Sequence, residues 1–248
     1  MDRPTRLPRL VLVHGTRMSR AQWEPYRALL PELELITVDL PGHGARVAEE
    51  FTGPAALATI EDAVREAAAP GSDGALPPPP VLAGHSLGGY LAALWAAERS
   101  DRLGALVLVG ASADPAGPLT GVYRGFARVV PRMDGDRLGR GMNLVFRALG
   151  ARGEHAAALP DGAAYASLPA AWSFVIDHAG PGLLDEVTCP VVLLNGQLDQ
   201  MRLHARRYAA HARDARVVTV RGATHLMPAT HPRQVAAVLR RAALAVGG

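Results

Sequence analysis

The chain has 248 residues, of which 49% are hydrophobic and 20% charged, and its net charge is +3. A chain of this size can bury a large core, and no segment reaches the roughly 18 uninterrupted apolar residues that a membrane span needs. All 26 basic residues are arginine. This excludes Schiff-base chemistry on lysine, and the scatter of the arginines along the chain argues against nucleic-acid binding.

The only cysteine, Cys189, precedes Pro190 at the start of an apolar run. No disulfide can form within the chain, and we expect this side chain to be a small buried hydrophobic group. The first nine residues lack the apolar core of a signal peptide. We therefore expect a cytoplasmic protein without a membrane partner, either a monomer or a homodimer.

Strands and helices alternate over the first 109 residues. Apolar runs predict four strands, at 10–13, 33–39, 81–83 and 103–109. Apolar residues at helical spacing predict three helices, at 21–30, 54–69 and 90–98. A connection rich in Gly, Ser and Pro at residues 70–80 holds no further element.

The regular alternation stops after residue 110 and resumes near residue 186. Three helical fragments separated by Gly, Pro and Arg are expected between these points, at 121–130, 137–149 and 163–179. The last part of the chain then predicts strands at 191–194 and 217–220 and helices at 202–211 and 232–245.

Six strands that alternate with helices predict an α/β fold with a mainly parallel sheet covered on both faces. The irregular segment, residues 112–185, is then a helical cap above the carboxyl ends of the strands, where such sheets bind ligands. We accordingly divide the chain into a core, residues 1–111 and 186–248, and this cap insertion.

Residues 84–88, with the sequence Gly-His-Ser-Leu-Gly, lie between a predicted strand and a predicted helix. The pattern Gly-x-Ser-x-Gly in this context is typical of a nucleophile elbow, in which the serine takes a strained conformation and the glycines let the backbone close up. We expect Ser86 to present its hydroxyl at the sheet edge. The N–H of Leu87 points the same way and opens a helix, whose dipole favours negative charge.

A serine hydroxyl needs a base within hydrogen-bond reach, and that base needs an orienting carboxylate. Asp199 follows the fifth predicted strand and His225 follows the sixth, so both fall at the edge where Ser86 emerges. Asp114, just past the fourth strand, is an alternative acid. His231 is an alternative base, but its sequence context predicts that it lies at the start of the last helix.

Several short motifs in this order resemble the α/β-hydrolase family, and the resemblance covers nearly the whole chain. They are Val13-His14-Gly15, the Asp-Leu-Pro-Gly-His-Gly of residues 39–44, the elbow, the Asn-Gly-Gln-Leu-Asp of residues 195–199, and Thr224-His225. The resemblance implies a triad of Ser86, Asp199 and His225. It also implies an oxyanion hole made by the amides of Leu87 and Thr16, with the side chain at position 16 free to vary.

The resemblance implies a carboxylesterase-type serine hydrolase that cleaves a small ester, lactone or thioester. We expect a small-molecule ester substrate and no cofactor or metal. Serine at the elbow argues against dehalogenase and epoxide hydrolase chemistry, which would use aspartate. Alternatives that keep the triad are a haloperoxidase, a lyase, a carbon-carbon bond hydrolase, or a hydrolase-fold receptor with slow turnover.

Three residues are candidates for substrate binding. Arg17 follows the expected oxyanion residue, and it either pairs with a cap carboxylate such as Asp177 or Asp185 or binds a carboxylate or phosphate of the substrate. Trp172 and Phe174 either form a small core of the cap or line an apolar acyl pocket.

Overall fold

The computed structural model describes residues 6–115, 117, 144 and 165–247. Its centre is a six-stranded sheet in which every neighbouring pair of strands runs parallel. In spatial order the strands are β2 (Leu35–Val38), β1 (Leu10–Val13), β3 (Val81–His85), β4 (Ala105–Val109), β5 (Val191–Gly196) and β6 (Ala215–Val220). The prediction of an α/β fold with a mainly parallel sheet is confirmed.

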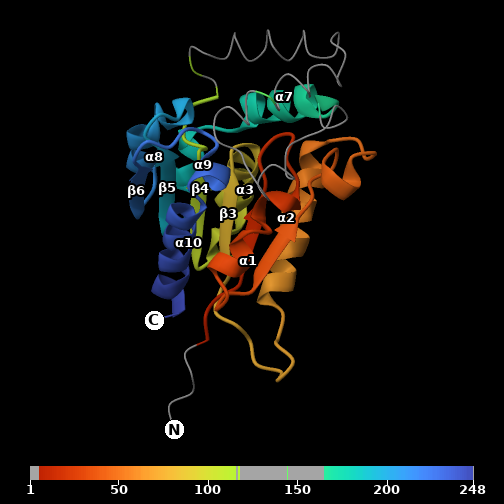
Figure 1. Cartoon of the computed structure of the whole chain (residues 1–248), viewed down its shortest axis with the longest axis vertical. Coiled ribbons are helices and arrows are strands. Elements are labelled where there is room, and N and C mark those ends of the chain that lie inside the picture. The colour runs from red at the N-terminus through yellow and green to blue at the C-terminus, as the bar shows by residue number, and fades with distance from the viewer. Residues whose placement is uncertain (1–5, 116, 118–143, 145–164, 248) are drawn as a thin grey trace.

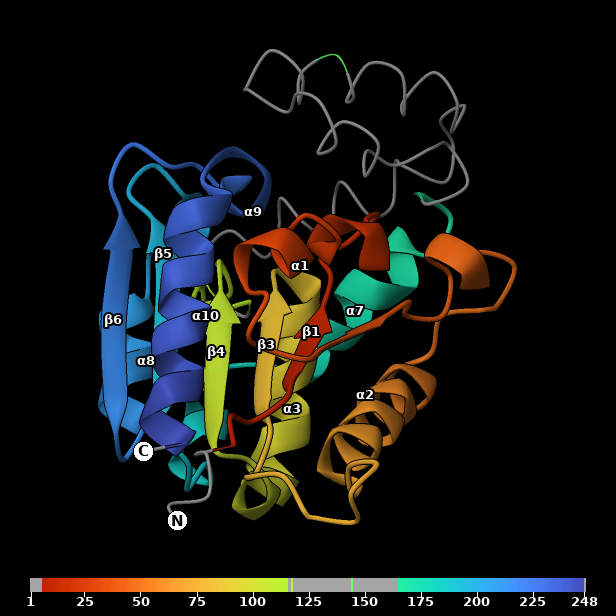
Figure 2. The same cartoon turned by 60° about the horizontal axis from the view of Figure 1, so that its bottom comes forward.

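Helices cover both faces of the sheet (Figures 1 and 2). One face packs against α2 (Gly53–Ala68), α3 (Leu87–Arg99) and α8 (Ala205–His211), and the other against α1 (Tyr26–Leu29) and α10 (Pro232–Gly247). Successive side chains of a strand point to opposite faces. Thus Val11 and Val13 of β1 join one apolar cluster while Leu10 and Leu12 join the other, which explains why these strands are continuous apolar runs.

The register of the strands brings the loops that follow them to one edge of the sheet. Val13 of β1 is level with Gly84 of β3, and His85 of β3 is level with Val109 of β4. The chain therefore leaves β1, β3 and β4 at nearly the same height. Figure 2 shows the strand arrows pointing to the end of the molecule where the short helix α9 (Met227–Thr230) lies.

The single helix predicted at 21–30 is wrong. The structure has a 3-10 helix η1 (Arg20–Trp23) followed by α1. The break falls at Pro25, which has no N–H for a helical hydrogen bond and is tolerated only in a first turn. The side chain of Ser19 accepts from the amide of Ala21 and so fixes the start of η1. The predicted helix at 202–211 also divides, into η7 (Gln200–Arg202) and α8.

The structure describes the last part of the segment predicted to be a cap, from residue 165 onward. Helix α7 (Leu168–His178) lies within the helix expected at 163–179, and η6 (Pro181–Asp185) follows it. Helix α7 packs against α3 through Ala171 and Val175. The helices expected at 121–130 and 137–149 lie outside the described residues, except for Leu144.

Cys189 is buried, as expected of a small apolar side chain. Burial raises the pKa of its thiol to about 11. Within the described ranges, no helix has the length and apolar character needed to cross a membrane.

Candidate active site

The turn between β3 and α3 consists of one residue, Ser86, which has a φ of 52° and a ψ of −116°. The flanking glycines are required by close backbone contacts. A Cβ on Gly84 would lie 2.2 Å from the carbonyl oxygen of Gly88, and one on Gly88 would lie 2.6 Å from that of His14. Any larger residue at these two positions would force the strand and the helix apart.

Ser86, His225 and Asp199 form a chain of hydrogen bonds. The Nε2 atom of His225 lies 3.0 Å from the Oγ of Ser86, and its Nδ1 lies 3.1 Å from both carboxylate oxygens of Asp199. The three residues come from different places, the turn after β3, the loop after β5 and the loop before α9. The structure thus brings together side chains that are up to 139 residues apart.

The carboxylate of Asp199 is buried, and burial alone would raise its pKa. Hydrogen bonds from the His225 ring and from the backbone N–H of Met201, which lies 2.8 Å from Oδ1, outweigh burial and hold the pKa below its usual range. An ionised carboxylate at Nδ1 keeps the proton of a neutral imidazole on that nitrogen. The lone pair of Nε2 then faces the serine hydroxyl.

Gly110, at the end of β4, is part of this arrangement although the sequence reasoning did not single it out. It has a φ of 57°, and a Cβ there would lie 3.0 Å from Oδ2 of Asp199 and 3.1 Å from Nδ1 of His225. The only signal in the sequence is a glycine directly after an apolar strand. Its position against the acid and the base becomes clear only in three dimensions.

The alternative acid and base have other partners. Oδ2 of Asp114 lies 2.8 Å from Nη1 of Arg207, and the backbone N–H of Asp114 donates to Nδ1 of His204. Nδ1 of His231 lies 2.9 Å from the hydroxyl oxygen of Thr230. The geometry therefore favours Asp199 and His225 for the two roles.

His85, which directly precedes the serine, ties the base to the rest of the site. Its Nε2–H donates to the backbone oxygen of His225 over 3.0 Å, and its Nδ1 lies 3.3 Å from Oε1 of Gln22. The same Oε1 accepts from the N–H of Gly15. Burial, with the neighbouring His225, lowers the pKa of His85 to about 3, so this ring is neutral.

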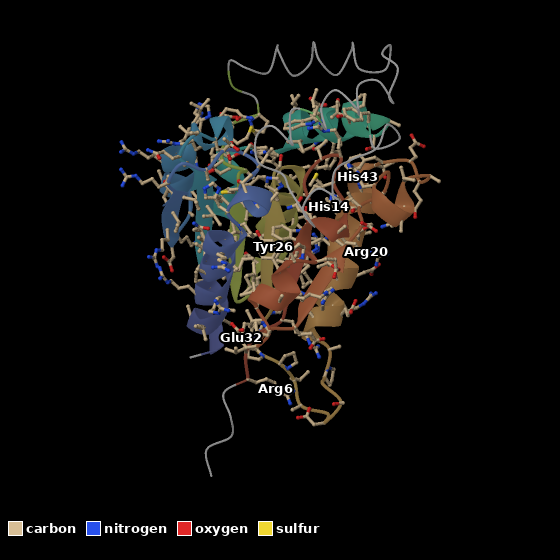
Figure 3. The ribbon with its side chains drawn as sticks, in the orientation of Figure 1. Arg6, His14, Arg20, Tyr26, Glu32 and His43 are labelled. Atoms are coloured by element: carbon tan, nitrogen blue, oxygen red, sulfur yellow. The ribbon has the colours of Figure 1, made fainter. Side chains whose placement is uncertain are left out.

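A second pair of histidines supports the loops after β1 and β2. Figure 3 shows His14 and His43 near each other, and their ring centroids are 5.1 Å apart. His14 donates from Nδ1 to Gly15 O and accepts at Nε2 from the N–H of Leu40. Burial, with the neighbouring His43, lowers the pKa of His14 to about 3. The Nε2 of His43 lies 3.4 Å from the hydroxyl of Ser167, next to the start of α7.

The two residues expected to form the oxyanion hole belong to the turn after β1 and to the start of α3. Leu87 is the first residue of α3 and is buried. Thr16 lies in the turn after β1. A Cβ on its neighbour Gly15 would lie 3.4 Å from the Cβ of Ser86, so this turn runs directly against the serine.

Arg17 has a left-handed backbone conformation, with a φ of 65°. Its Nη1 donates to the hydroxyl of Tyr165 over 2.9 Å, and its guanidinium lies 5.1 Å from the centre of the Tyr165 ring. Of the two carboxylates suggested as its partners, Asp185 accepts from His211 instead. Arg17 thus joins the loop after β1 to the residues that precede α7.

Trp172 and Phe174 occupy different surroundings although both lie on α7. Trp172 lines a cavity of about 200 Å³ together with Tyr90 and Met201. Tyr90 lies in the first turn of α3, where its N–H donates to the carbonyl of Ser86. The Phe174 ring instead packs against Gly53 of α2 and stacks on His178 at 4.4 Å.

Within the described part of the chain, no group of three or more His, Cys, Asp or Glu side chains has an arrangement that could hold a metal ion. The residues gathered at the site are a hydroxyl, an imidazole and a carboxylate in sequence, next to a helix N-terminus. This arrangement can activate the hydroxyl as a nucleophile and stabilise negative charge beside it.

The profile of the Alpha/beta hydrolase family matches residues 10–238. The chain is 34% identical over 103 residues to the pimeloyl-[acyl-carrier protein] methyl ester esterase of Serratia marcescens and 35% identical over 118 residues to lipase LipV of Mycobacterium tuberculosis. These matches span 42% and 48% of this chain but 36% and 41% of the relatives. The solved structure of an esterase from Thermogutta terrifontis is similar with a TM-score of 0.75 and 24% identity, over 97% of this chain and 91% of that one.

Proposed function

The chain belongs to the α/β-hydrolase family, and we propose that it is a hydrolytic enzyme of the serine carboxylesterase type. It cleaves a small ester, lactone or thioester through an acyl-enzyme formed on Ser86. Ester hydrolysis is supported by the two curated relatives, which are named as an esterase and a lipase.

The observation that carries this proposal is the hydrogen-bond chain from Ser86 through His225 to Asp199. In the first half of the reaction, Nε2 of His225 takes the proton of the serine hydroxyl while Oγ bonds to the substrate carbonyl carbon. The amides of Leu87 and Thr16 donate to the resulting oxyanion. Nε2–H then gives the proton to the leaving alcohol as the ester bond breaks.

In the second half, water replaces the alcohol. The water oxygen attacks the acyl carbon while His225 takes a proton from the water. His225 then gives that proton to Ser86 when the acyl-enzyme bond breaks. The free acid leaves and the enzyme is restored. Asp199 stays ionised throughout and stabilises the imidazolium that forms twice in each cycle.

The proposed substrate contacts lie on and around α7. The cavity beside Trp172, of about 200 Å³ and with mainly apolar walls, fits a short acyl or alkyl chain. The contacts of Phe174 favour a packing role, and its place in a pocket stays a prediction. Likewise, we keep as proposals the division into a core and a cap at residues 112–185, and an anion-binding role for Arg17.

A steady-state assay on short-chain p-nitrophenyl esters tests the proposal. The wild-type protein should release p-nitrophenol with saturation kinetics, and Ser86→Ala should lower kcat by about 10⁵ to 10⁶ because the nucleophile is absent. A matched control is Ser173→Ala, which removes an exposed hydroxyl on α7 and should leave kcat unchanged. Equal turnover by the wild-type and Ser86→Ala proteins would contradict a serine mechanism. Ester binding without turnover by the wild type would favour a receptor.

A further inference from the structure

A cavity of about 480 Å³ lies at the end of the sheet opposite the candidate active site. The first residues of β4 and β5, Ala105 and Val191, line it together with the second half of α10. Figure 2 shows this half of α10 at the end of the molecule away from α9. At about 3.3 Å per residue, the length of β4 separates the two ends of the sheet by roughly 13 Å. The cavity is therefore distinct from the site around Ser86.

The walls of this cavity are apolar and incompletely covered. Val192, Val218, Val238 and Val246 line it and are only partly buried, although each packs against the apolar cluster beneath α10. Two of these valines belong to β5 and to the edge strand β6, and two belong to α10. A concave apolar surface of this volume is the usual form of a small-molecule site.

Two arginines line the same cavity from different elements. Arg216 of β6 is level with Val192 of β5, and the alternation of a strand puts its side chain on the same face as that of Val218. Arg241 lies on α10, three residues after Val238 and so on the same side of the helix. Within the described ranges, neither guanidinium has an ion-pair partner. Both remain available to a ligand.

The composition of the walls restricts the chemistry of that ligand. Among the described residues that line the cavity, the only polar side chains are the two arginines and Asp214, and none is aromatic. A sugar or a nucleotide would find neither neutral hydrogen-bond partners nor a ring on which to stack. Two guanidinium groups and one carboxylate leave an excess of one positive charge, which matches a ligand with a single negative charge. The guanidinium fork suits a carboxylate.

We propose that this cavity binds a fatty acid of short or medium length. The aliphatic chain lies against the four valines, and the carboxylate lies between Arg216 and Arg241. The volume is in the lower part of the range of about 300–1,000 Å³ that small-molecule sites occupy, which suits a chain of this length. The inference concerns a second site and does not rest on the esterase function proposed above.

Calorimetric titration with sodium octanoate tests the head-group contacts. The wild-type protein should bind octanoate saturably. Arg216→Gln and Arg241→Gln should each lower the affinity by about tenfold, because each removes a charge-assisted hydrogen bond to the carboxylate. Octan-1-ol has the same chain length without the charge, so its affinity should be equal in the wild type and both variants. Both arginines are exposed, so the Tm should not change.

A third substitution tests the place of the chain. Ala245 is an exposed residue of the cavity wall, and the indole of Ala245→Trp should fill the cavity and lower the affinity for octanoate and octan-1-ol alike, by about tenfold or more. The matched control is Arg233→Gln, which replaces an exposed arginine of α10 outside the cavity and should bind octanoate as the wild type does. Ester turnover should be the same in all these variants, because the cavity lies at the other end of the sheet.

The proposal is overturned if octanoate shows no saturable binding, or if both arginine variants bind it with the wild-type affinity. It is also overturned if Ala245→Trp binds octanoate as the wild type does, because the ligand would then lie elsewhere, for example beside Ser86. A wild-type dimer that Ala245→Trp dissociates would show that a second copy of the chain covers the cavity instead. None of these results depends on Ser86→Ala, so the esterase function stands or falls separately.

Discussion

Two residues other than glycine, Arg17 and Ser86, have a positive φ in the part of the chain that the structure describes, and both border the candidate site. Such conformations cost about 1–3 kcal/mol each and concentrate at functional sites. The strain at Ser86 could be predicted, because the Gly-x-Ser-x-Gly pattern is specific to this turn. No local pattern in the sequence marks Arg17, whose side chain donates to the hydroxyl of Tyr165, 148 residues away.

The choice between the two acids is a residue-scale prediction. Asp199→Asn should lower kcat by up to about 10⁴, because an amide in place of the carboxylate favours the wrong tautomer of His225. The matched variant Asp114→Asn should have a mild effect, since its carboxylate pairs with Arg207 on the surface. Steady-state kinetics of both variants on one ester provide the comparison. If Asp114→Asn lost more of its kcat than Asp199→Asn, the acid of the triad would be Asp114, just past the end of β4.

At the scale of elements, the strands were the most predictable part. All six strands were located from the sequence, and β1, β3 and β4 are continuous buried runs, because the central strands of a parallel sheet are covered on both faces. Their parallel order then placed the loops carrying Ser86, Asp199 and His225 at one edge. The triad could therefore be proposed from topology, before any distance was known.

Elements whose form depends on a single residue or on distant contacts were less predictable. Pro25 divides a segment of helical pattern into η1 and α1. The contacts of His85 with His225 and Gln22 join loops that are 140 and 63 residues away. No periodicity in the sequence encodes such contacts, so the roles of His85 and Gly110 could not be inferred before the fold was known.

At the scale of the whole molecule, buried histidines link stability to pH. His14 and His85 have pKa values of about 3 in the folded protein because burial disfavours the charged ring, against 6.5 for an ordinary histidine. Below pH 6.5 the unfolded chain therefore binds protons that the native state does not bind. The stability they contribute is complete above pH 6.5 and is lost as the pH falls toward 3.

Between pH 6.5 and about 3, each of these two histidines should lower the free energy of unfolding by about 1.4 kcal/mol for every unit by which the pH falls. Urea unfolding at pH 7, 6, 5 and 4 measures this slope. His14→Asn should reduce the slope, whereas His178→Gln, which replaces an exposed ring, should leave it unchanged. A stability independent of pH over this range, or a His14→Asn slope equal to wild type, would contradict buried neutral histidines.

The central claim is that Ser86 is the nucleophile of a serine esterase, and covalent labelling tests it most directly. A fluorophosphonate reacts with a serine that is activated by a neighbouring base, and mass spectrometry of the digested protein locates the adduct. We predict one adduct per chain, on Ser86, because its hydroxyl is the one that lies within hydrogen-bond reach of Nε2 of His225. An adduct on another residue, or a protein that stays unlabelled while it hydrolyses esters, would contradict the account.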